Sequence, residues 1–339
     1  MPVIVQALYL GLMTFFILSG YFYRPNRGFK NNMVKRLKQI GVPLIICAIT
    51  LPLVLYIWLL INGYDLPISD YLDSVVYYLG FSGVFTDTSS VNAMTSLTNV
   101  DVGVYFILAM LGGFLVFYAL ADRVMDDARK VAVTIIGLLV VSMLLKEFLT
   151  IKLPAELDLA PLAAAFMFVG ALLSKIKFIE NVEYGEKKRL RYWALPIICL
   201  IAGLVMCYIL PPDIRFDHRF FGDYGSISII PFFIEAVLMF VPVVYIGFFF
   251  SKIPGLSAVF DGLGKHTLAI ILVHAFVIKM VIAPFYTVDP LILVPEYVPM
   301  GLRLAVIPIA LVVSSLIGYF SYQVYQRAVG AKDSKTEAK

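Results

Sequence analysis

The feature that most constrains this chain is its series of apolar runs, each long enough to cross a lipid bilayer. A spanning helix needs about 20 mostly apolar residues, because the hydrocarbon core is about 30 Å thick. By that rule we predict about nine spans, near residues 4–22, 41–62, 101–120, 131–149, 157–174, 193–210, 228–250, 267–286 and 300–325. Backbone groups in lipid must pair within their own segment, so these runs are expected to be helices. The predicted fold class is an all-α polytopic membrane protein.

The composition agrees with a membrane protein and excludes an ordinary soluble domain. Of the 339 residues, 61% are apolar and 15% are charged, whereas a soluble domain has about 45–50% apolar and about 25% charged residues. The net charge of +4 does not indicate a nucleic-acid partner, because basic residues gather in the cytoplasmic loops of membrane proteins. The three cysteines lie in apolar runs without metal-ligand spacing, so we expect neither disulfides nor a metal site.

Basic residues in the connections orient the predicted bundle. The connections near 23–40 and 175–192 are rich in Lys and Arg, whereas residues 63–100 contain four Asp and no basic residue. The positive-inside rule therefore places the first two connections and the C-terminus in the cytoplasm, and Met1 outside. We predict an integral membrane domain over residues 1–326 and a short polar cytoplasmic tail over residues 327–339.

Two predicted outer connections are long enough to carry binding surfaces. Residues 63–100 include the aromatic-rich stretch YLDSVVYYLGFSG at 71–83, which we expect to lie flat at the membrane interface. Residues 211–226 mix charged and aromatic side chains and contain His218. For His218, acceptor recognition and an ordinary exposed histidine are both open.

Ionisable side chains inside spans are costly and often functional. His274 is about eight residues into its predicted helix, roughly 12 Å deep at 1.5 Å per residue, and Glu235 lies in the outer half of its span. For both residues we weigh a functional role against a structural hydrogen bond between helices. Lys146 and Lys279 lie toward span ends, where a lysine can extend its ammonium group to the headgroups.

The first basic connection also suits a phosphorylated ligand. Arg36, Gln39 and Pro43 have the i, i+3, i+7 spacing of one helix face. Arginine binds phosphate through two parallel hydrogen bonds, so this connection could attract a ligand such as coenzyme A. Its six basic residues are Arg24, Arg27, Lys30, Lys35, Arg36 and Lys38. Membrane topology alone also explains their number.

Four segments occur in a fixed order along the chain: FFILSGYF at 15–22, VKRLKQIGVP at 34–43, FMFVGALL at 166–173 and GKHTLAIILVH at 264–274. Together they resemble the acyltransferase-3 family of bacterial membrane O-acyltransferases. In that family an F-F-x-x-S-G-Y segment ends a helix and an R-x-x-R-x-x-x-P segment opens the next. A G-K-x-S-L-x-I-Y-L-x-H segment lies near the C-terminus. The resemblance extends over nearly the whole chain.

The resemblance implies an enzyme of the bacterial cytoplasmic membrane that moves an acetyl or succinyl group from acyl-CoA to a carbohydrate hydroxyl. The acceptor would belong to the cell envelope or be secreted. Acyl-CoA is then a donor substrate, and no permanently bound cofactor is expected. The positions that match family motifs are Ser19 and Gly20 of the SG turn, Arg36, Pro43, Gly170, Gly264, Lys265, Thr267 and His274.

The acyltransferase hypothesis gives roles to individual residues, some at family-motif positions and some chosen for their charge or their place in a span. His274 and Glu235 are the predicted catalytic residues: a histidine helps to deprotonate the acceptor hydroxyl, and Glu235 would orient His274 or bind acceptor hydroxyls. We expect His274 to shape or polarise the site rather than to act as the sole base. The predicted donor-binding residues are Arg36, Lys35, Lys38 and Ser19.

Two departures from the family pattern leave alternatives open. Gln39 replaces the second arginine of the family's pair. The chain also begins at what resembles the second helix of the family, so its layout matches ten spans minus the first, which bears the family's catalytic histidine. Either the start lies upstream or this member has lost its base. A transporter or flippase of a lipid-linked sugar or acyl group, and a catalytically inactive relative, are the alternatives.

Overall fold

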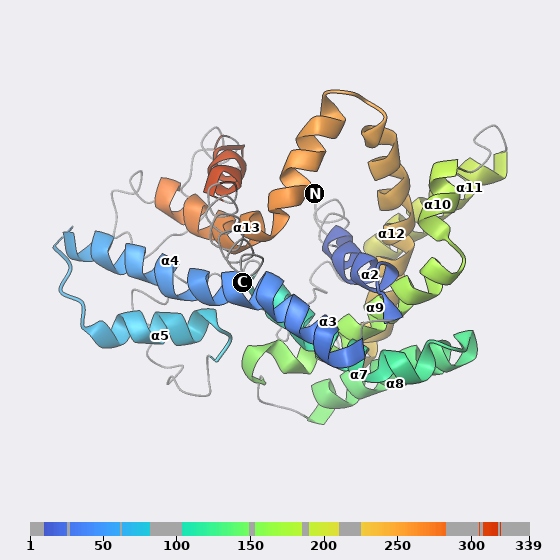
Figure 1. The fold of residues 1–339 in the computed structure, drawn as a ribbon, viewed down its shortest axis with the longest axis horizontal. Helices are drawn as coiled ribbons and strands as arrows, with labels where there is room; N and C mark the ends of the chain where they lie inside the picture. The colour runs from blue at the N-terminus through green and yellow to red at the C-terminus, as the bar shows by residue number, and fades with distance from the viewer. Residues whose placement is uncertain are drawn as a thin grey trace, which may run out of the picture. The chain divides into compact units, whose positions relative to one another are not determined.

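The computed structural model describes residues 10–25, 28–61, 63–81, 104–148, 153–184, 190–209, 225–282, 305, 308–317 and 319. Every regular element in these ranges is a helix (Figure 1). The chain divides into two compact units. Unit 1 comprises residues 1–41 and 105–257, and unit 2 comprises residues 42–104 and 258–339.

Seven helices of the described residues are long and apolar enough to cross a membrane. They are Gly28–Ile61, Tyr105–Val124, Ala128–Phe148, Pro154–Lys175, Tyr192–Ile209, Ser226–Ser251 and Leu256–His274. Each overlaps one predicted span. Two shorter apolar helices, Gly11–Tyr21 and Pro308–Ile317, lie within the first and last predicted spans. The predicted all-α, multi-pass class is confirmed.

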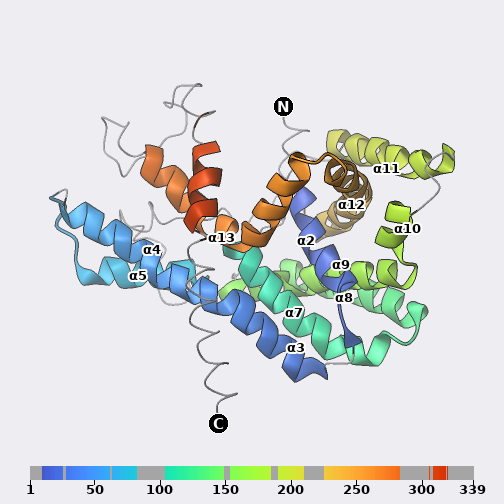
Figure 2. The same cartoon turned by 45° about the horizontal axis from the view of Figure 1, so that its top comes forward.

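Helix α9 (Ala160–Lys175) is the buried centre of unit 1. Helices α2 (Thr14–Tyr21) and α8 (Ala128–Phe148) pack against it, and α11 (Leu190–Ile209) pairs with α12 (Ile229–Ser251), as Figures 1 and 2 show. The sequence of α9, APLAAAFMFVGALL, contains many small residues, which let neighbouring helices approach closely in lipid. The other elements of the unit are η1 (Gly11–Met13), α3 (Gly28–Arg36), η3 (Leu37–Gly41), α7 (Val104–Val124), η4 (Pro154–Leu159), α10 (Phe178–Tyr184) and η5 (Ser226–Ser228).

Helices α2 and α9 cross at two glycines, each of which contacts the backbone of the other helix. A Cβ atom on Gly20 would lie 1.8 Å from the carbonyl oxygen of Met167, and one on Gly170 would lie 1.8 Å from that of Ile17. The crossing therefore has no room for any side chain at either position. The expected turn at Ser19 and Gly20 is not present, because both residues lie inside α2. Gly20 serves close packing instead of chain reversal.

Phenylalanine rings fill the core around this crossing. Phe16 of α2 lies 4.6 Å from Phe106 of α7 and 6.3 Å from Phe166 of α9, measured between ring centroids. Phe166 also stacks on Phe233 of α12 at 4.8 Å. All four rings are buried. They connect four helices, and aromatic pairs of this kind add about 0.5–1.5 kcal/mol beyond the burial of their area.

The first basic connection is largely helical: the helix face predicted from Arg36 onward begins earlier still, well before the span predicted near 41–62. The apolar helix begins at Gly28, and its middle is the π-helical turn η3 between α3 and α4 (Val42–Ile61). Pro43 follows this turn by two residues. Proline has no N–H, and its ring crowds the carbonyl four residues earlier, which disfavours regular α-helical geometry at this position, although Pro52 is accommodated inside α4.

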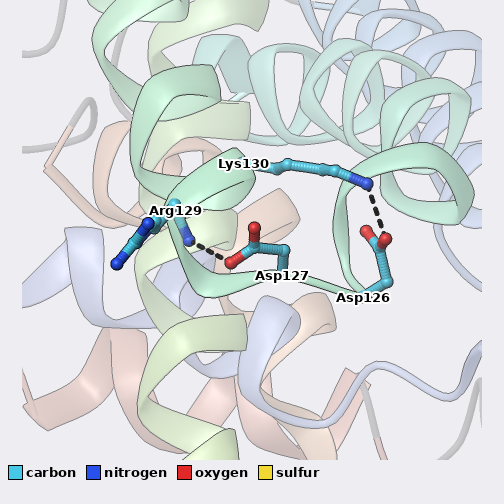
Figure 3. A network of polar contacts seen from close by, with 4 residues as sticks. All are labelled: Asp126, Asp127, Arg129 and Lys130. Atoms are coloured by element: carbon cyan, nitrogen blue, oxygen red, sulfur yellow. Dashed lines mark hydrogen bonds and ion pairs between the residues drawn. The ribbon is translucent and has the colours of Figure 1, made fainter.

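Two acidic side chains in the turn between α7 and α8 make polar contacts with the first turn of α8 (Figure 3). The carboxylate of Asp127 accepts a 2.8 Å hydrogen bond from the backbone N–H of Arg129 and so caps the start of α8. Lys130 forms a 2.6 Å ion pair with Asp126. The hydrogen bond from Lys130 holds the pKa of the Asp126 carboxyl below its ordinary value. Both side chains are exposed, so this pair contributes little to stability.

Unit 2 contains α4, α5 (Ile68–Tyr78) and α13 (Leu256–Ile282), of which the first two residues of α13 belong to unit 1. Helix α5 runs back along α4 in both views (Figures 1 and 2). The hydroxyl of Tyr71 donates to the backbone carbonyl of Ile49 at 3.3 Å. The buried hydroxyl of Tyr78 donates to the backbone carbonyl of Leu272 at 2.8 Å. The aromatic stretch at 71–83 is therefore mostly helical, and its location at the membrane interface stays a prediction.

The glycine crossing predicts that Gly170→Ala destabilises the protein. The new methyl group would meet a backbone oxygen, which cannot rotate away, so we expect a loss of about 3 kcal/mol or more. Thermal unfolding of the purified protein in detergent measures this change. Gly137→Ala in α8 is the matched control, because a Cβ there meets nothing within 4 Å and alanine favours a helix by up to about 1 kcal/mol. Equal melting temperatures for Gly170→Ala and the wild type would contradict the crossing.

Candidate functional site

Arg36, the residue predicted to bind phosphate, ends α3 and is held by two aromatic side chains of α7. Its Nε–H donates to the hydroxyl of Tyr118 at 3.2 Å, and its guanidinium carbon lies 4.7 Å from the ring centroid of Phe114. Both aromatic residues are buried. Within the described part of the chain, no carboxylate pairs with Arg36. The aromatic contacts fix the side chain and leave its positive charge for an anion.

The Arg36 side chain lines a cavity of about 280 Å³. The lining residues are Phe22, Tyr23, Arg24, Asn32, Lys35, Arg36 and Tyr118. Three of them are cations and none carries a carboxylate. A water molecule takes about 30 Å³ in the liquid, so the cavity has room for a group as large as a phosphate. A concave site of one charge sign concentrates ions of the opposite sign, which here are anions.

Tyr23 adds a neutral hydrogen-bonding wall to this cavity. Its hydroxyl donates to Asp122 at 3.0 Å, and its ring lies 5.7 Å from that of Tyr118. Burial and the hydrogen bond to Asp122 raise the pKa of Tyr23 well above its ordinary value. Tyr23 therefore stays an uncharged phenol at neutral pH, and the positive charge of the cavity is not reduced.

The helical register of α3 explains which predicted donor-binding residues reach the cavity. Asn32, Lys35 and Arg36 have i, i+3, i+4 spacing and share one helix face. Lys38 follows Arg36 by two residues, which turns it to another side, and it lies exposed in η3. Ser19 is half-buried in α2. Neither Lys38 nor Ser19 lines the cavity, and their roles stay predictions.

Glu235 lies fully buried on α12 in unit 1. The thiol of Cys207 on α11 lies near enough to the Glu235 carboxylate to interact with it. This contact joins two paired helices and fits the structural alternative that the sequence leaves open. A catalytic role for Glu235 stays a prediction.

His274 lies on α13 in unit 2, and its ring is tied to its own helix. Nδ1 lies 2.8 Å from the carbonyl oxygen of Ile270 and 2.9 Å from that of Ile271. Because a carbonyl oxygen can only accept, Nδ1 carries the proton, and Nε2 of the neutral ring is the basic nitrogen. The hydroxyl of Thr267, two turns earlier, also donates within the helix, to Leu263 at 2.9 Å. The expected contact between His274 and Glu235 stays a prediction.

A second polar region of unit 1 was missed by the sequence analysis. Glu156 and Asp158 of η4 are buried, and Asp158 lines a cavity of about 20 Å³ together with Ser142 and Lys146. That volume holds about one water molecule. In the sequence, Glu156 and Asp158 stand at the start of the span predicted near 157–174 and have no predicted role, and Lys146 is predicted to extend its ammonium group to the headgroups.

The backbone of η4 contains two residues with positive φ, which the sequence did not predict. Ala155 has φ 55° and Glu156 has φ 56°, in the left-handed region that residues with a side chain rarely adopt. Such strain persists only where the surrounding structure enforces it, and it is frequent at functional sites. The sequence offers no glycine here to signal it. The one usable signal is the pair of acids that opens an otherwise apolar span.

Several predicted features lie outside the described residues. These are the outer-loop residues 82–103, residues 210–224 with His218, and the polar tail 327–339. Acceptor recognition by the outer loops therefore stays a prediction. Among the residues that are described, no group of three His, Cys, Asp or Glu side chains is placed to hold a metal ion.

The comparison with known protein families agrees with the resemblance that the four sequence segments indicated. The acyltransferase-3 family model, described as "Acyltransferase domain", matches residues 3–319. Neither a curated protein nor a solved structure matches the chain. The family match extends over both units and over all seven long apolar helices. The chain therefore belongs to the acyltransferase-3 family of membrane proteins.

Proposed function

We propose that this protein is an O-acyltransferase of the bacterial cytoplasmic membrane that moves an acetyl or succinyl group from acyl-CoA to a hydroxyl of a cell-envelope or secreted carbohydrate. Membership of the acyltransferase family supports acyl transfer. The observation that carries the choice of donor is the Arg36 cavity, which has three cations and no carboxylate among its lining residues. With the predicted topology, this cavity and the C-terminus are cytoplasmic.

The donor-binding step rests on charge and on the fixed position of Arg36. Coenzyme A carries a diphosphate and a 3′-phosphate, and a guanidinium group can bind two oxygens of one phosphate. Arg24 and Lys35 add positive charge to the same cavity. Tyr118 and Phe114 hold the Arg36 side chain before the ligand arrives, which reduces the entropy lost on binding.

In the transfer step, the acceptor hydroxyl oxygen attacks the thioester carbonyl carbon of the donor. A C–O bond forms, the C–S bond breaks, and coenzyme A leaves as its thiol with the proton released by the hydroxyl. A base near the hydroxyl eases this proton transfer. Nε2 of His274 is unprotonated in the neutral ring and is proposed to polarise the acceptor hydroxyl. Glu235 is proposed to bind acceptor hydroxyls or to orient His274.

A transporter of a lipid-linked sugar or acyl group is the second candidate. The buried carboxyl of Glu235 favours it, because ionisable groups within spans often line substrate paths. Reconstitution in liposomes separates the two functions. Movement of a lipid-linked sugar across the membrane without acyl-CoA would favour transport, whereas acyl transfer that requires acyl-CoA would favour the enzyme.

Arg36→Ala should weaken coenzyme A binding at least tenfold. The loss of one charge-assisted interaction is worth about 1.5–3 kcal/mol, and the remaining cations of the cavity cannot bind phosphate in the same geometry. Calorimetric titration of the protein in lipid nanodiscs with coenzyme A measures the effect. Lys130→Ala is the control, because Lys130 lies in the first turn of α8, is paired with Asp126 and does not line the cavity. An unchanged affinity of the Arg36 variant would rule out this donor site.

His274→Ala should lower acyl transfer without changing coenzyme A affinity. Loss of a group that moves or polarises a proton in the reaction typically reduces the rate about 10²–10⁴-fold. The release of free thiol from acetyl-CoA or succinyl-CoA, in membranes supplied with cell-envelope carbohydrate, follows turnover. A variant that turns over like the wild type would remove His274 from the mechanism. A wild-type protein that binds coenzyme A but shows no turnover would point to an inactive relative.

A further inference from the structure

Asn32 is a buried amide at the wall of the Arg36 cavity. Only 7% of its surface is exposed, and it lines the cavity together with Lys35 and Arg36. Its Nδ2 atom is buried and has no hydrogen-bond partner in the structure. The neighbouring Asn31 is exposed. Asn32 thus presents an unused hydrogen-bond donor beside two cations.

Helix packing does not require an asparagine at this position. Asparagine is a poorer helix former than alanine, and a buried donor without a partner destabilises the folded state. Buried polar groups are nearly always paired, so an exception requires a reason such as a ligand. The ligand must offer an acceptor atom, because the unpaired group is an N–H.

We propose that Asn32 is a phosphate-binding residue whose Nδ2–H donates to a non-bridging phosphoryl oxygen of the ligand held by Arg36 and Lys35. Phosphoryl oxygens are strong acceptors, and the i, i+3, i+4 spacing aims all three side chains at one volume. The amide N–H would orient the bound phosphoryl group through a directional hydrogen bond, without adding charge to the cavity. This inference rests on the proposed function only for the source of the phosphate, which is coenzyme A in that proposal.

Two sources of a phosphoryl group can meet a basic cavity at the membrane surface. One is the soluble donor coenzyme A, and the other is the headgroup of an anionic phospholipid. Both offer the same acceptor atoms. The experiment therefore uses nanodiscs of neutral phosphatidylcholine for coenzyme A binding, and mixed nanodiscs with phosphatidylglycerol for lipid binding.

Coenzyme A binding is measured by calorimetry for Asn32→Ala, Asn32→Asp and the control Asn31→Ala. We expect Asn32→Ala to weaken binding about tenfold, which corresponds to about 1.4 kcal/mol. Asn32→Asp should weaken it further, because a carboxylate of the same shape repels phosphate and cannot donate. Asn31→Ala should bind as the wild type does. Pantetheine, which lacks every phosphate, should not distinguish the wild type from either Asn32 variant.

Thermal unfolding without ligand separates a binding role from a structural one. Asn32→Ala removes an unsatisfied donor and improves helix propensity, so its melting temperature should equal or exceed that of the wild type. A lower melting temperature together with unchanged coenzyme A affinity would assign Asn32 to packing and overturn the proposal.

The remaining outcomes distinguish this proposal from the proposed function. If Arg36→Ala loses coenzyme A binding and both Asn32 variants keep it, the role of Asn32 is wrong and the acyltransferase proposal stands. A second outcome is that the wild type does not bind coenzyme A but retains phosphatidylglycerol in native mass spectrometry, and that Asn32→Ala reduces this retention. In that case the phosphate site stands and the assignment of coenzyme A as its ligand fails. If the wild type retains neither ligand, both proposals fail.

Discussion

The backbone contact between α2 and α9 is the interaction on which unit 1 depends. In lipid, helices gain little from the hydrophobic effect when they associate, so close van der Waals packing must hold them together. Gly20 and Gly170 permit that packing because neither carries a side chain. One residue after Gly20, the hydroxyl of Tyr21 donates to the Glu180 carboxylate and accepts from the backbone N–H of Ile179 at 3.1 Å. The end of α2 is therefore anchored immediately before the residues that begin the cavity wall.

A row of aromatic side chains on α7 connects the cavity to α9, which links packing to the candidate site. On α7, three aromatic residues at i, i+3 and i+4 form one row: Phe114, Phe117 and Tyr118. Phe117 packs against Tyr23 at 5.1 Å and against Phe168 of α9 at 4.7 Å. Tyr118 stacks on Phe114 at 5.4 Å and accepts the hydrogen bond from Arg36. A shift of α9 would therefore displace the side chains that position Arg36.

Properties that depend on local sequence could be predicted, and those that depend on tertiary contacts could not. Each membrane helix was predictable because its length and apolarity are properties of one segment. The i, i+3, i+4 face with Lys35 and Arg36 was also within reach, but the burial of Asn32 depends on the packing around α3. The left-handed backbone at Ala155 and Glu156 has no local signature, since neither residue is a glycine. The turn at Ser19 and Gly20 was expected from the family resemblance alone, and a glycine near a helix end serves turns and close packing equally well.

The π-helical turn after Arg36 explains why the family's second arginine can be replaced by Gln39 in this chain without loss of charge from the cavity. In an unbroken α-helix, Gln39 would share the face of Arg36 at i+3, where the family places its second arginine. Gln39 instead lies within η3, where i→i+5 hydrogen bonds wind more residues into each turn. Gln39 is exposed and does not line the cavity. The cavity draws its positive charge from Arg24, Lys35 and Arg36, so the loss of an arginine at position 39 does not remove a charge from it.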